Sequence, residues 1–393
     1  MAGRTTALSL DARRRGGGLE VDSFYHLGDT PMEGKLCTGL GCFAARGLNL
    51  QRWNLAVGQQ PRVYCLGRCF SAPSCSDDPE EPLIEVRCRR PIILEGMADG
   101  SIRSLAGYGG YRALAMAREM GAKGVLDEID RSQLRGRGGA GFPAGRKWRS
   151  VFEQPDPVKY VVANADEGDH GSYIDKTVIE YAPHRLLEAM AIAALAVGAA
   201  KGIVYLRKEY PLAFHRLVAA VDEARSAGLL GEAFDVEIVV GRGSYVCGEE
   251  TSLLNSIEHR RPEVRVRPPY PTESGLFGKP TLVSNVETLS NAPWIIQNGG
   301  DAYAAMGFSR SRGTKAISLS SLFNRPGVYE IEFGMSLRTI VEELGGGLKT
   351  GSLKALIVGG PLAGLIHPSE LDVRFGFEEM QAIGASVGHG GIV

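Results

Sequence analysis

Residues 160–167 read Tyr-Val-Val-Ala-Asn-Ala-Asp-Glu, an apolar run that ends in polar and acidic side chains. A short run of this kind is typical of a buried strand in a parallel sheet. Similar strand patterns recur at 203–206 and 236–240, and helix patterns at 183–197 and 211–228 alternate with them. This alternation predicts an α/β layer fold whose ligand site lies beyond the carboxyl ends of the strands.

The whole chain has the composition of a globular protein with about two or three domains. It has 393 residues, 44% of them apolar, and its 44 Lys and Arg balance 45 Asp and Glu. No run approaches the ~20 apolar residues of a membrane-spanning helix, and no signal-type segment follows Arg4–Arg15. We therefore expect a cytoplasmic protein without membrane insertion and without a nucleic-acid partner. Residues 1–20, rich in Gly and Arg, predict a disordered tail.

Three units are predicted along the chain. Residues 21–97 form a cysteine-rich unit with short strands at 62–64 and 83–87, and residues 98–312 carry the α/β alternation. Residues 313–393 predict a small α+β domain. Its expected elements are strands at 314–319 and 328–331, a helix at 336–343 and a strand at 355–358.

Four of the seven cysteines form two close pairs. The pairs are Cys37-x₄-Cys42 and Cys65-x₃-Cys69, with 22 residues between them. In a cytoplasmic chain such thiols predict metal ligands or buried thiols rather than disulfides. Structural zinc sites usually contain C-x₂-C units, so the spacing favours a [2Fe–2S] cluster, with zinc or unmetallated buried thiols as alternatives.

A glycine-rich segment at 135–143 reads Arg-Gly-Arg-Gly-Gly-Ala-Gly-Phe-Pro and contains a formal G-x-G-x-x-G. Residues 127–134 do not form a strand pattern before it, so the standard dinucleotide-binding fold is disfavoured. Glycines let backbone N–H groups approach a phosphate or a planar ring, and nearby cations add charge-assisted bonds. The cations are Arg135, Arg137, Arg146 and Lys147. A flexible surface loop is the alternative.

Three further segments carry polar and aromatic groups. Residues 164–169 follow a strand directly, and residues 241–251 place glycines and Tyr245 before two glutamates at a helix start. Residues 265–271 predict a stiff, extended aromatic edge that suits stacking on a base. Each segment also has a structural alternative. Residues 164–169 could be a solvated turn, the two glutamates of residues 241–251 a helix cap, and residues 265–271 a stiff linker.

Taken in order, these motifs resemble the flavoprotein subunit of respiratory complex I. The same unit occurs in NAD-reducing hydrogenases and NAD-dependent formate dehydrogenases, and the resemblance covers about residues 98–393. In that family FMN lies on the glycine-rich loop and NADH stacks against the flavin. The resemblance implies FMN contacts from Gly136, Gly138, Gly139, Lys147, Asn164, Asp166, Tyr245, Gly248, Glu249, Asn285 and Thr288. It implies that Phe142, Glu167, Glu250, Arg267 and Tyr270 shape the NADH side.

The flanking units also resemble parts of that family. Residues 21–97 resemble its thioredoxin-like [2Fe–2S] domain, most clearly at 63–73, and residues 313–393 resemble its ubiquitin-like (β-grasp) domain. The short spacing between the cysteine pairs indicates an abridged thioredoxin-like fold. Two departures, Asp169-His170-Gly171 and Ser284-Asn285, fall near the expected flavin. The family's C-terminal [4Fe–4S] domain is absent, which indicates a fragment.

The expected function is that of an NADH dehydrogenase (diaphorase) module. It would transfer hydride between NAD(H) and FMN and pass single electrons to iron–sulfur clusters, with the cofactors supplying the reactivity and no catalytic acid or base from the protein. Its partners would be subunits of a formate dehydrogenase, hydrogenase or complex I type, with a [4Fe–4S] centre if the full-length chain continues. The alternatives are a non-catalytic nucleotide-binding or assembly subunit and a zinc-stabilised binding module.

Overall fold

The computed structural model describes residues 25–78 and 81–393, so the disordered tail predicted for residues 1–20 lies outside the described residues. A four-stranded sheet, ordered β4-β3-β2-β5, forms the centre of the largest unit, and its neighbouring strands are all parallel. The strands are β2 (Tyr160–Ala165), β3 (Lys201–Leu206), β4 (Asp235–Val240) and β5 (Thr281–Asn285). The predicted α/β fold is confirmed.

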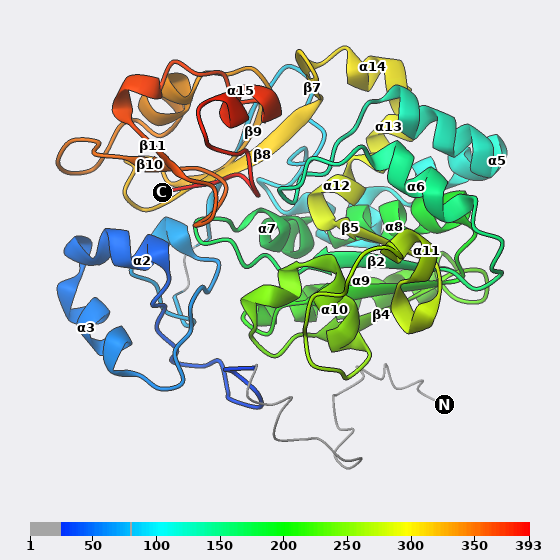
Figure 1. Cartoon of the computed structure of the whole chain (residues 1–393), viewed down its shortest axis with the longest axis horizontal. Coiled ribbons are helices and arrows are strands. Elements are labelled where there is room, and N and C mark those ends of the chain that lie inside the picture. The colour runs from blue at the N-terminus through cyan, green and yellow to red at the C-terminus, as the bar shows by residue number, and fades with distance from the viewer. Residues whose placement is uncertain (1–24, 79–80) are drawn as a thin grey trace.

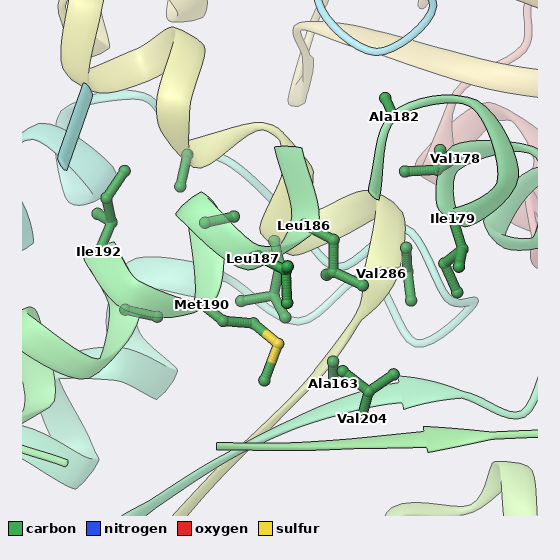
Figure 2. Packing of buried hydrophobic residues seen from close by; sticks show 14 of the residues in the cluster. Ala163, Val178, Ile179, Ala182, Leu186, Leu187, Met190, Ile192, Val204 and Val286 are labelled. Atoms are coloured by element: carbon green, nitrogen blue, oxygen red, sulfur yellow. The ribbon is translucent and has the colours of Figure 1, made fainter. Parts of the chain in front are cut away.

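Helix α8 (Pro183–Val197) covers one face of this sheet, with the bounds predicted from its sequence. Proline starts the helix, and Gly198 ends it at φ +80°, where its N–H donates to the Ala194 carbonyl. Figure 2 shows Leu186, Leu187 and Met190 directed from α8 toward the sheet. The helix is buried nearly all round because α5 (Arg112–Arg131) packs against it as well.

The two faces of the sheet are covered by different helices, because neighbouring side chains of a strand point to opposite sides. Val161 and Ala163 belong to the core that contains α8, whereas Val162 packs with Leu253 and Leu254 of α10 (Glu250–Ile257). Figure 1 shows the sheet between these helices. The other helices of the unit are α4 (Leu105–Tyr108), α6 (Ala144–Phe152), α7 (Ile174–Tyr181), α9 (Pro211–Ser226), α11 (Pro271–Ser274), α12 (Val286–Ser290), α13 (Ala292–Asn298) and α14 (Gly300–Ala304).

A second sheet, ordered β1-β9-β8-β12, organises the C-terminal unit. The predicted hairpin is present as β8 (Thr314–Leu319) and β9 (Gly327–Glu332), which pair antiparallel. Strand β12 (Gly391–Ile392) lies parallel to β8. The strand predicted at residues 83–87 also forms, as β1 (Leu83–Arg87), but it pairs with β9 rather than within the cysteine-rich segment.

Smaller elements complete the C-terminal unit. The predicted helix at 336–343 is a π-helix at Thr339–Leu344, and the strand predicted at 355–358 is the shorter β10 (Leu356–Ile357). Strand β10 pairs with β11 (Leu365–Ile366). The remaining elements are β6 (Gly307–Phe308), β7 (Ser311–Arg312) and α15 (Phe377–Ala382).

The cysteine-rich segment contains two short helices, α2 (Leu40–Ala44) and α3 (Leu50–Gly58). The strand predicted at residues 62–64 is wrong, because Val63 makes only a single bridge, to Cys37. Figure 1 shows the segment, in blue, beside the C-terminal unit. Ser321 joins the two, since its N–H donates to the Cys69 carbonyl at 2.7 Å. None of the helices among residues 25–78 and 81–393 is both long and apolar enough to cross a bilayer.

A buried carboxylate of β9 ties the second sheet to residues 92–94, just before the predicted start of the α/β unit at residue 98. Glu330 is fully buried, and its oxygens accept bonds from the backbone N–H groups of residues 92–94 at 2.8–3.1 Å. The Thr314 hydroxyl adds a bond of 2.6 Å. Burial raises the pKa of Glu330, and the hydrogen bonds oppose that shift.

We predict that Glu330→Ala lowers the free energy of unfolding by about 3 kcal/mol or more, because several buried donors lose their acceptor. Urea denaturation at pH 7 measures this as a lower midpoint. The control is Glu332→Ala, two residues along the strand, whose partner Arg89 is 87% exposed, and it should change the midpoint much less. Equal losses in the two variants would contradict this role of Glu330.

Candidate functional site

The carboxyl ends of β2 and β5 lie side by side and present amide side chains. Asn164 and Asn285 occupy paired positions at these strand ends. The Asn164 side chain donates to the Gly248 carbonyl at 2.8 Å, and the Asn285 side chain caps α12 by accepting from the Thr288 N–H at 3.0 Å. This edge of the sheet is where α/β proteins bind ligands.

The glycine-rich loop runs between α5 and α6 and closes over this edge. Its ends are joined by a bond from the Gly136 N–H to the Phe142 carbonyl at 2.9 Å. A Cβ on Gly138 would lie 3.0 Å from the Cβ of Asn285, so the loop rests directly on the strand end and leaves little room for a side chain. Helix α5, which ends at Arg131, precedes the loop in place of a strand. This agrees with the expectation that the fold is not of the standard dinucleotide-binding type.

We expected four cations around the loop to add charge-assisted bonds to a ligand. For two of them, Arg135 and Arg137, that expectation was wrong, because they do not face the cleft. Arg137 is fully buried and donates to the Tyr303 hydroxyl and the Arg312 carbonyl, both at 2.7 Å. Arg135 pairs with Glu378 at 2.7 Å. These arginines anchor the loop from behind, and a sequence pattern does not distinguish this role from ligand binding.

A cleft of about 690 Å³ opens at the strand ends. This volume lies within the range of small-molecule and cofactor sites. Most of the predicted site residues line it: Gly136, Gly138, Phe142, Lys147, Asn164, Gly248, Glu249, Glu250, Arg267, Tyr270, Asn285 and Thr288. Arg146, Trp148 and Ser284 line it as well.

An adjoining hollow of about 510 Å³ shares part of this lining. The remaining residues predicted to contact FMN or NADH line this second hollow, namely Gly139, Asp166, Glu167 and Tyr245. Tyr245 packs against Gly168 and donates from its hydroxyl to Asp169 at 2.8 Å. The sixteen predicted residues therefore gather around two adjoining hollows, although the first and last of them, Gly136 and Thr288, are 152 positions apart.

Two of the cations that face the cleft, Lys147 and Arg267, are already paired with carboxylates. Lys147 Nζ lies 2.6 Å from Glu250 Oε2. Arg267 pairs with Glu249, and its second nitrogen lies 3.5 Å from Glu250. A phosphate that enters the cleft would compete with these carboxylates for Lys147 and Arg267.

Exposed aromatic rings stand at the mouth of the cleft. Phe142 and Tyr270 are 49% and 53% exposed, and both line the cavity. Large exposed rings beside a cavity suit stacking on a planar ligand. Arg146 lies near the Phe142 ring at 5.9 Å and adds a positive charge there.

Asp166 carries a buried carboxyl in the wall of the second hollow. Burial raises its pKa to about 7, although Arg207 acts in the opposite direction. Its Oδ2 has no hydrogen-bond partner within the described part of the chain. A buried polar atom without a partner at the wall of a cavity is free to accept a bond from a ligand.

Glu167 is engaged in the protein itself. Its carboxylate accepts bonds from the backbone N–H groups of residues 174–176 and from the hydroxyls of Ser172 and Tyr210. Burial opposes ionisation, but His389 and these bonds lower the pKa of Glu167 to about 2. A role for Glu167 on the nucleotide side stays a prediction, since its described bonds are all internal.

His389 lines the second hollow and was missed from the sequence. It is 5% exposed, and its Nε2 lies 2.8 Å from Asp175 and 3.0 Å from the Asn285 side chain. No spacing rule identifies a lone histidine between glycines as a site residue. Its proximity to Asn285 arises only through the fold.

The four paired cysteines meet in the N-terminal segment. Cys37, Cys42, Cys65 and Cys69 are all buried and free. The Cys37 thiol contacts those of Cys42 and Cys65, and the Cys65 thiol also contacts that of Cys69. Hydrogen bonds from Cys37 and Cys69 hold the pKa of Cys65 well below its usual value, against the effect of burial. Such a set is suited to a metal centre.

A smaller cavity of about 250 Å³ lies between the cysteines and the second hollow. Tyr64, Asp166, His170 and Tyr245 line it. His170 bridges the two units, because its Nδ1 accepts from the Leu40 N–H at 3.0 Å. The departure at Asp169-His170-Gly171 therefore falls at the contact between the cysteine segment and the cleft.

Comparison with known proteins agrees with this geometry. Residues 129–294 match the family model described as the Nuo51 FMN-binding domain. The chain is 45% identical over 292 residues to the NADP-reducing hydrogenase subunit HndC of Solidesulfovibrio fructosivorans, which covers 72% of this chain and 59% of that protein. It is 41% identical over 316 residues to an NADH-quinone oxidoreductase subunit of Rhizobium meliloti, which covers 77% of this chain and 75% of that protein.

A solved structure extends the likeness to nearly the whole chain. A chain of the NAD⁺-reducing [NiFe]-hydrogenase in the H₂-reduced state superposes with a TM-score of 0.79 at 28% identity, covering 95% of this chain and 70% of that one. The chain thus belongs to the Nuo51 FMN-binding family of oxidoreductase subunits, and the resemblance drawn from its motifs is confirmed.

We predict that Gly138→Val abolishes FMN binding, because the added atoms would collide with Asn285 beneath the loop. Acid extraction and chromatography of the purified protein measure bound FMN. Gly47→Val is the control, since a Cβ there meets nothing within 4 Å. Full FMN content in Gly138→Val, with the fold intact by circular dichroism, would show that the loop does not hold the flavin.

Proposed function

We propose that this chain is the NADH-oxidising flavoprotein module of a multi-subunit oxidoreductase. It would bind FMN and NAD(H) in the cleft and pass electrons toward an iron–sulfur cluster in its own N-terminal segment. The observation that carries the proposal is the convergence of sixteen predicted cofactor residues on two adjoining hollows. Membership of an FMN-binding family, from whose motifs these residues were predicted, supports it as well.

The loop and the strand ends would hold FMN. Bound FMN supplies hydride exchange with a nicotinamide and one-electron exchange with a metal centre. Gly136, Gly138 and Gly139 leave the space that a ring or phosphate needs, and Lys147 offers a cation to a phosphate. The unpartnered Asp166 Oδ2 offers a polar contact at the wall.

The mouth of the cleft would receive the nucleotide. Phe142 and Tyr270 provide exposed rings for stacking, and Arg267 provides a cation for a phosphate. Glu250 would accept hydrogen bonds from ribose hydroxyls. The protein thereby orients two stacked rings for hydride transfer, and we assign no side chain as acid or base.

The buried cysteines would hold a [2Fe–2S] cluster. No three cysteines in the described ranges bring their sulfurs within 4.8 Å of one another. Tetrahedral zinc with Zn–S bonds of about 2.3 Å requires sulfurs about 3.8 Å apart, so a two-metal cluster suits this open arrangement better. N–H groups of Gly39 and Gly67 lie 3.4 Å from Cys37 Sγ and Cys65 Sγ and would tune the cluster.

The flanking units would be family domains. Of the thioredoxin-like domain expected at residues 21–97, residues 25–78 would form an abridged version, because β1 (Leu83–Arg87) lies in the C-terminal sheet. Residues 313–393 would form a ubiquitin-like (β-grasp) domain. The antiparallel hairpin β8–β9 with β12 parallel to β8 supports the second assignment. Partners would be the other subunits of a cytoplasmic complex of the hydrogenase, formate dehydrogenase or complex I type. One of them, or a longer form of this chain, would carry a [4Fe–4S] centre.

A direct experiment tests the function. The protein is reconstituted with FMN under anaerobic conditions and mixed with NADH, and loss of flavin absorbance at about 450 nm reports hydride transfer. Ferricyanide then accepts the electrons in a steady-state assay. Flavin that stays oxidised in the presence of NADH would indicate a non-catalytic nucleotide-binding or assembly subunit.

Cys65→Ala should remove the EPR signal of the reduced [2Fe–2S] cluster and leave flavin reduction by NADH intact, because the cysteines and the cleft belong to different units. Cys88→Ala, which alters a cysteine outside the four, should keep the signal. Metal analysis accompanies both spectra. Zinc without iron in anaerobically prepared protein would reject the cluster.

Glu250→Gln should weaken NADH use by about ten- to a hundred-fold and reduce the preference for NADH over NADPH. Loss of a hydrogen bond to a charged acceptor costs about 1.5–3 kcal/mol, and a carboxylate also repels an added 2′-phosphate. Ferricyanide reduction measures kcat/KM for both nucleotides at known flavin content. Glu263→Gln is the surface control. If the preference for NADH over NADPH is unchanged, the role of Glu250 is limited to its ion pairs with Lys147 and Arg267, and the residue does not bind the nucleotide.

A further inference from the structure

His389 sits where the last strand of the second sheet meets the cleft of the first. Its neighbour Gly388 and its own side chain line the second hollow together with Gly138 and Asn285. Lys315, ion-paired with Glu287, donates to the His389 carbonyl at 3.0 Å and holds its backbone. The imidazole is therefore fixed in place beside the proposed flavin site.

Both ring nitrogens of His389 face carboxylates. Nδ1 lies 2.6 Å from the hydroxyl of Ser172, which itself donates to Glu167, and 3.1 Å from Glu167 Oε1. Nε2 lies 2.8 Å from Asp175 Oδ2. A neutral imidazole has one N–H, so donation at both nitrogens requires the doubly protonated form. Burial would lower the pKa of His389, but the two carboxylates outweigh it and raise the pKa well above 6.5.

The contact on the Nε2 side leads directly to the flavin cradle. The Asn285 side chain donates to the same Asp175 oxygen at 2.6 Å. Asn285 also accepts from Thr288 and lies under Gly138. Asp175, held by His389, thus sets the position of Asn285 at the floor of the site.

A metal ion is a poorer explanation of the same cluster. Ligand atoms of Glu167, Asp175 and His389 do lie within 4.8 Å of one another. However, the Glu167 oxygens already accept three backbone N–H bonds, and Asp175 Oδ1 accepts one from Glu287 at 3.1 Å. A cation would have to displace these bonds, whereas an imidazolium complements them.

We propose that His389 is a positioning residue for the flavin: as a buried imidazolium clamped between Glu167 and Asp175, it fixes Asn285 and offsets the charge of the two carboxylates behind the flavin site. This proposal rests on the proposed function. Without the imidazolium, the two carboxylates would add net negative charge beside the site, which disfavours the reduced, more negative flavin relative to the oxidised one.

The first test needs no flavin. ¹⁵N NMR of histidine-labelled protein at pH 8 distinguishes imidazolium from neutral imidazole, and His389→Gln assigns the signal among the seven histidines. We expect both nitrogens of His389 to carry protons at this pH. A spectrum in which all seven rings are neutral overturns the proposal, whether or not the variant folds.

The second test uses the reconstituted protein. His389→Gln should bind FMN about ten-fold more weakly in a fluorescence titration, because Asn285 loses its fixed position. The midpoint potential of its bound FMN should also become more negative. The control is His184→Gln: His184 is also buried and faces a carboxylate, Glu223, at 3.2 Å, but it lines neither hollow and should change neither quantity.

The outcomes separate the two proposals. A wild-type protein that binds no FMN overturns both the function and the role of His389. Wild-type binding with unchanged affinity and potential in His389→Gln overturns the role of His389 alone. Lower affinity with an unchanged potential also overturns it, since a purely structural residue would behave in that way.

Discussion

The arrangement of the cleft depends on one buried carboxylate, that of Glu167. It follows β2 directly and accepts the first free N–H groups of α7, while the Tyr210 hydroxyl and His389 approach from other segments. A buried charge is tolerated only when its hydrogen bonds are satisfied. The end of β2, the start of α7 and the C-terminal segment must therefore come together as one unit. This requirement makes the wall of the site rigid.

Two of the cations in the cleft are paired with carboxylates before any ligand arrives. Lys147 and Arg267 are held by Glu249 and Glu250, so neither cation faces the cavity alone. Pairing limits the cost of partly burying these cations, and it keeps their long side chains ordered. Phosphate binding then exchanges one set of charged hydrogen bonds for another. Differences in affinity between nucleotides should therefore depend on how well their phosphates replace the carboxylates as hydrogen-bond partners of Lys147 and Arg267.

Local signals in the sequence predicted much of the fold. Helix α8 was readable because Pro183 marks its start, and β2 because its valines form an apolar run before polar residues. The cleft residues were predicted through ordered family motifs rather than through physics alone. Arg137 was misjudged, because whether an arginine beside glycines turns toward a ligand or into the core depends on Tyr303 and Arg312, far along the chain.

Strand β1 has a consequence for how the chain can be divided. It leaves the cysteine-rich segment and adds to the edge of the C-terminal sheet beside β9. A shortened protein that starts at residue 98 would keep every residue of the flavin cleft but expose the backbone of β9 along its length. Open strand edges pair with other chains and promote aggregation. A flavin module that starts just before Leu83 would avoid that edge and is the better choice for isolating the cleft.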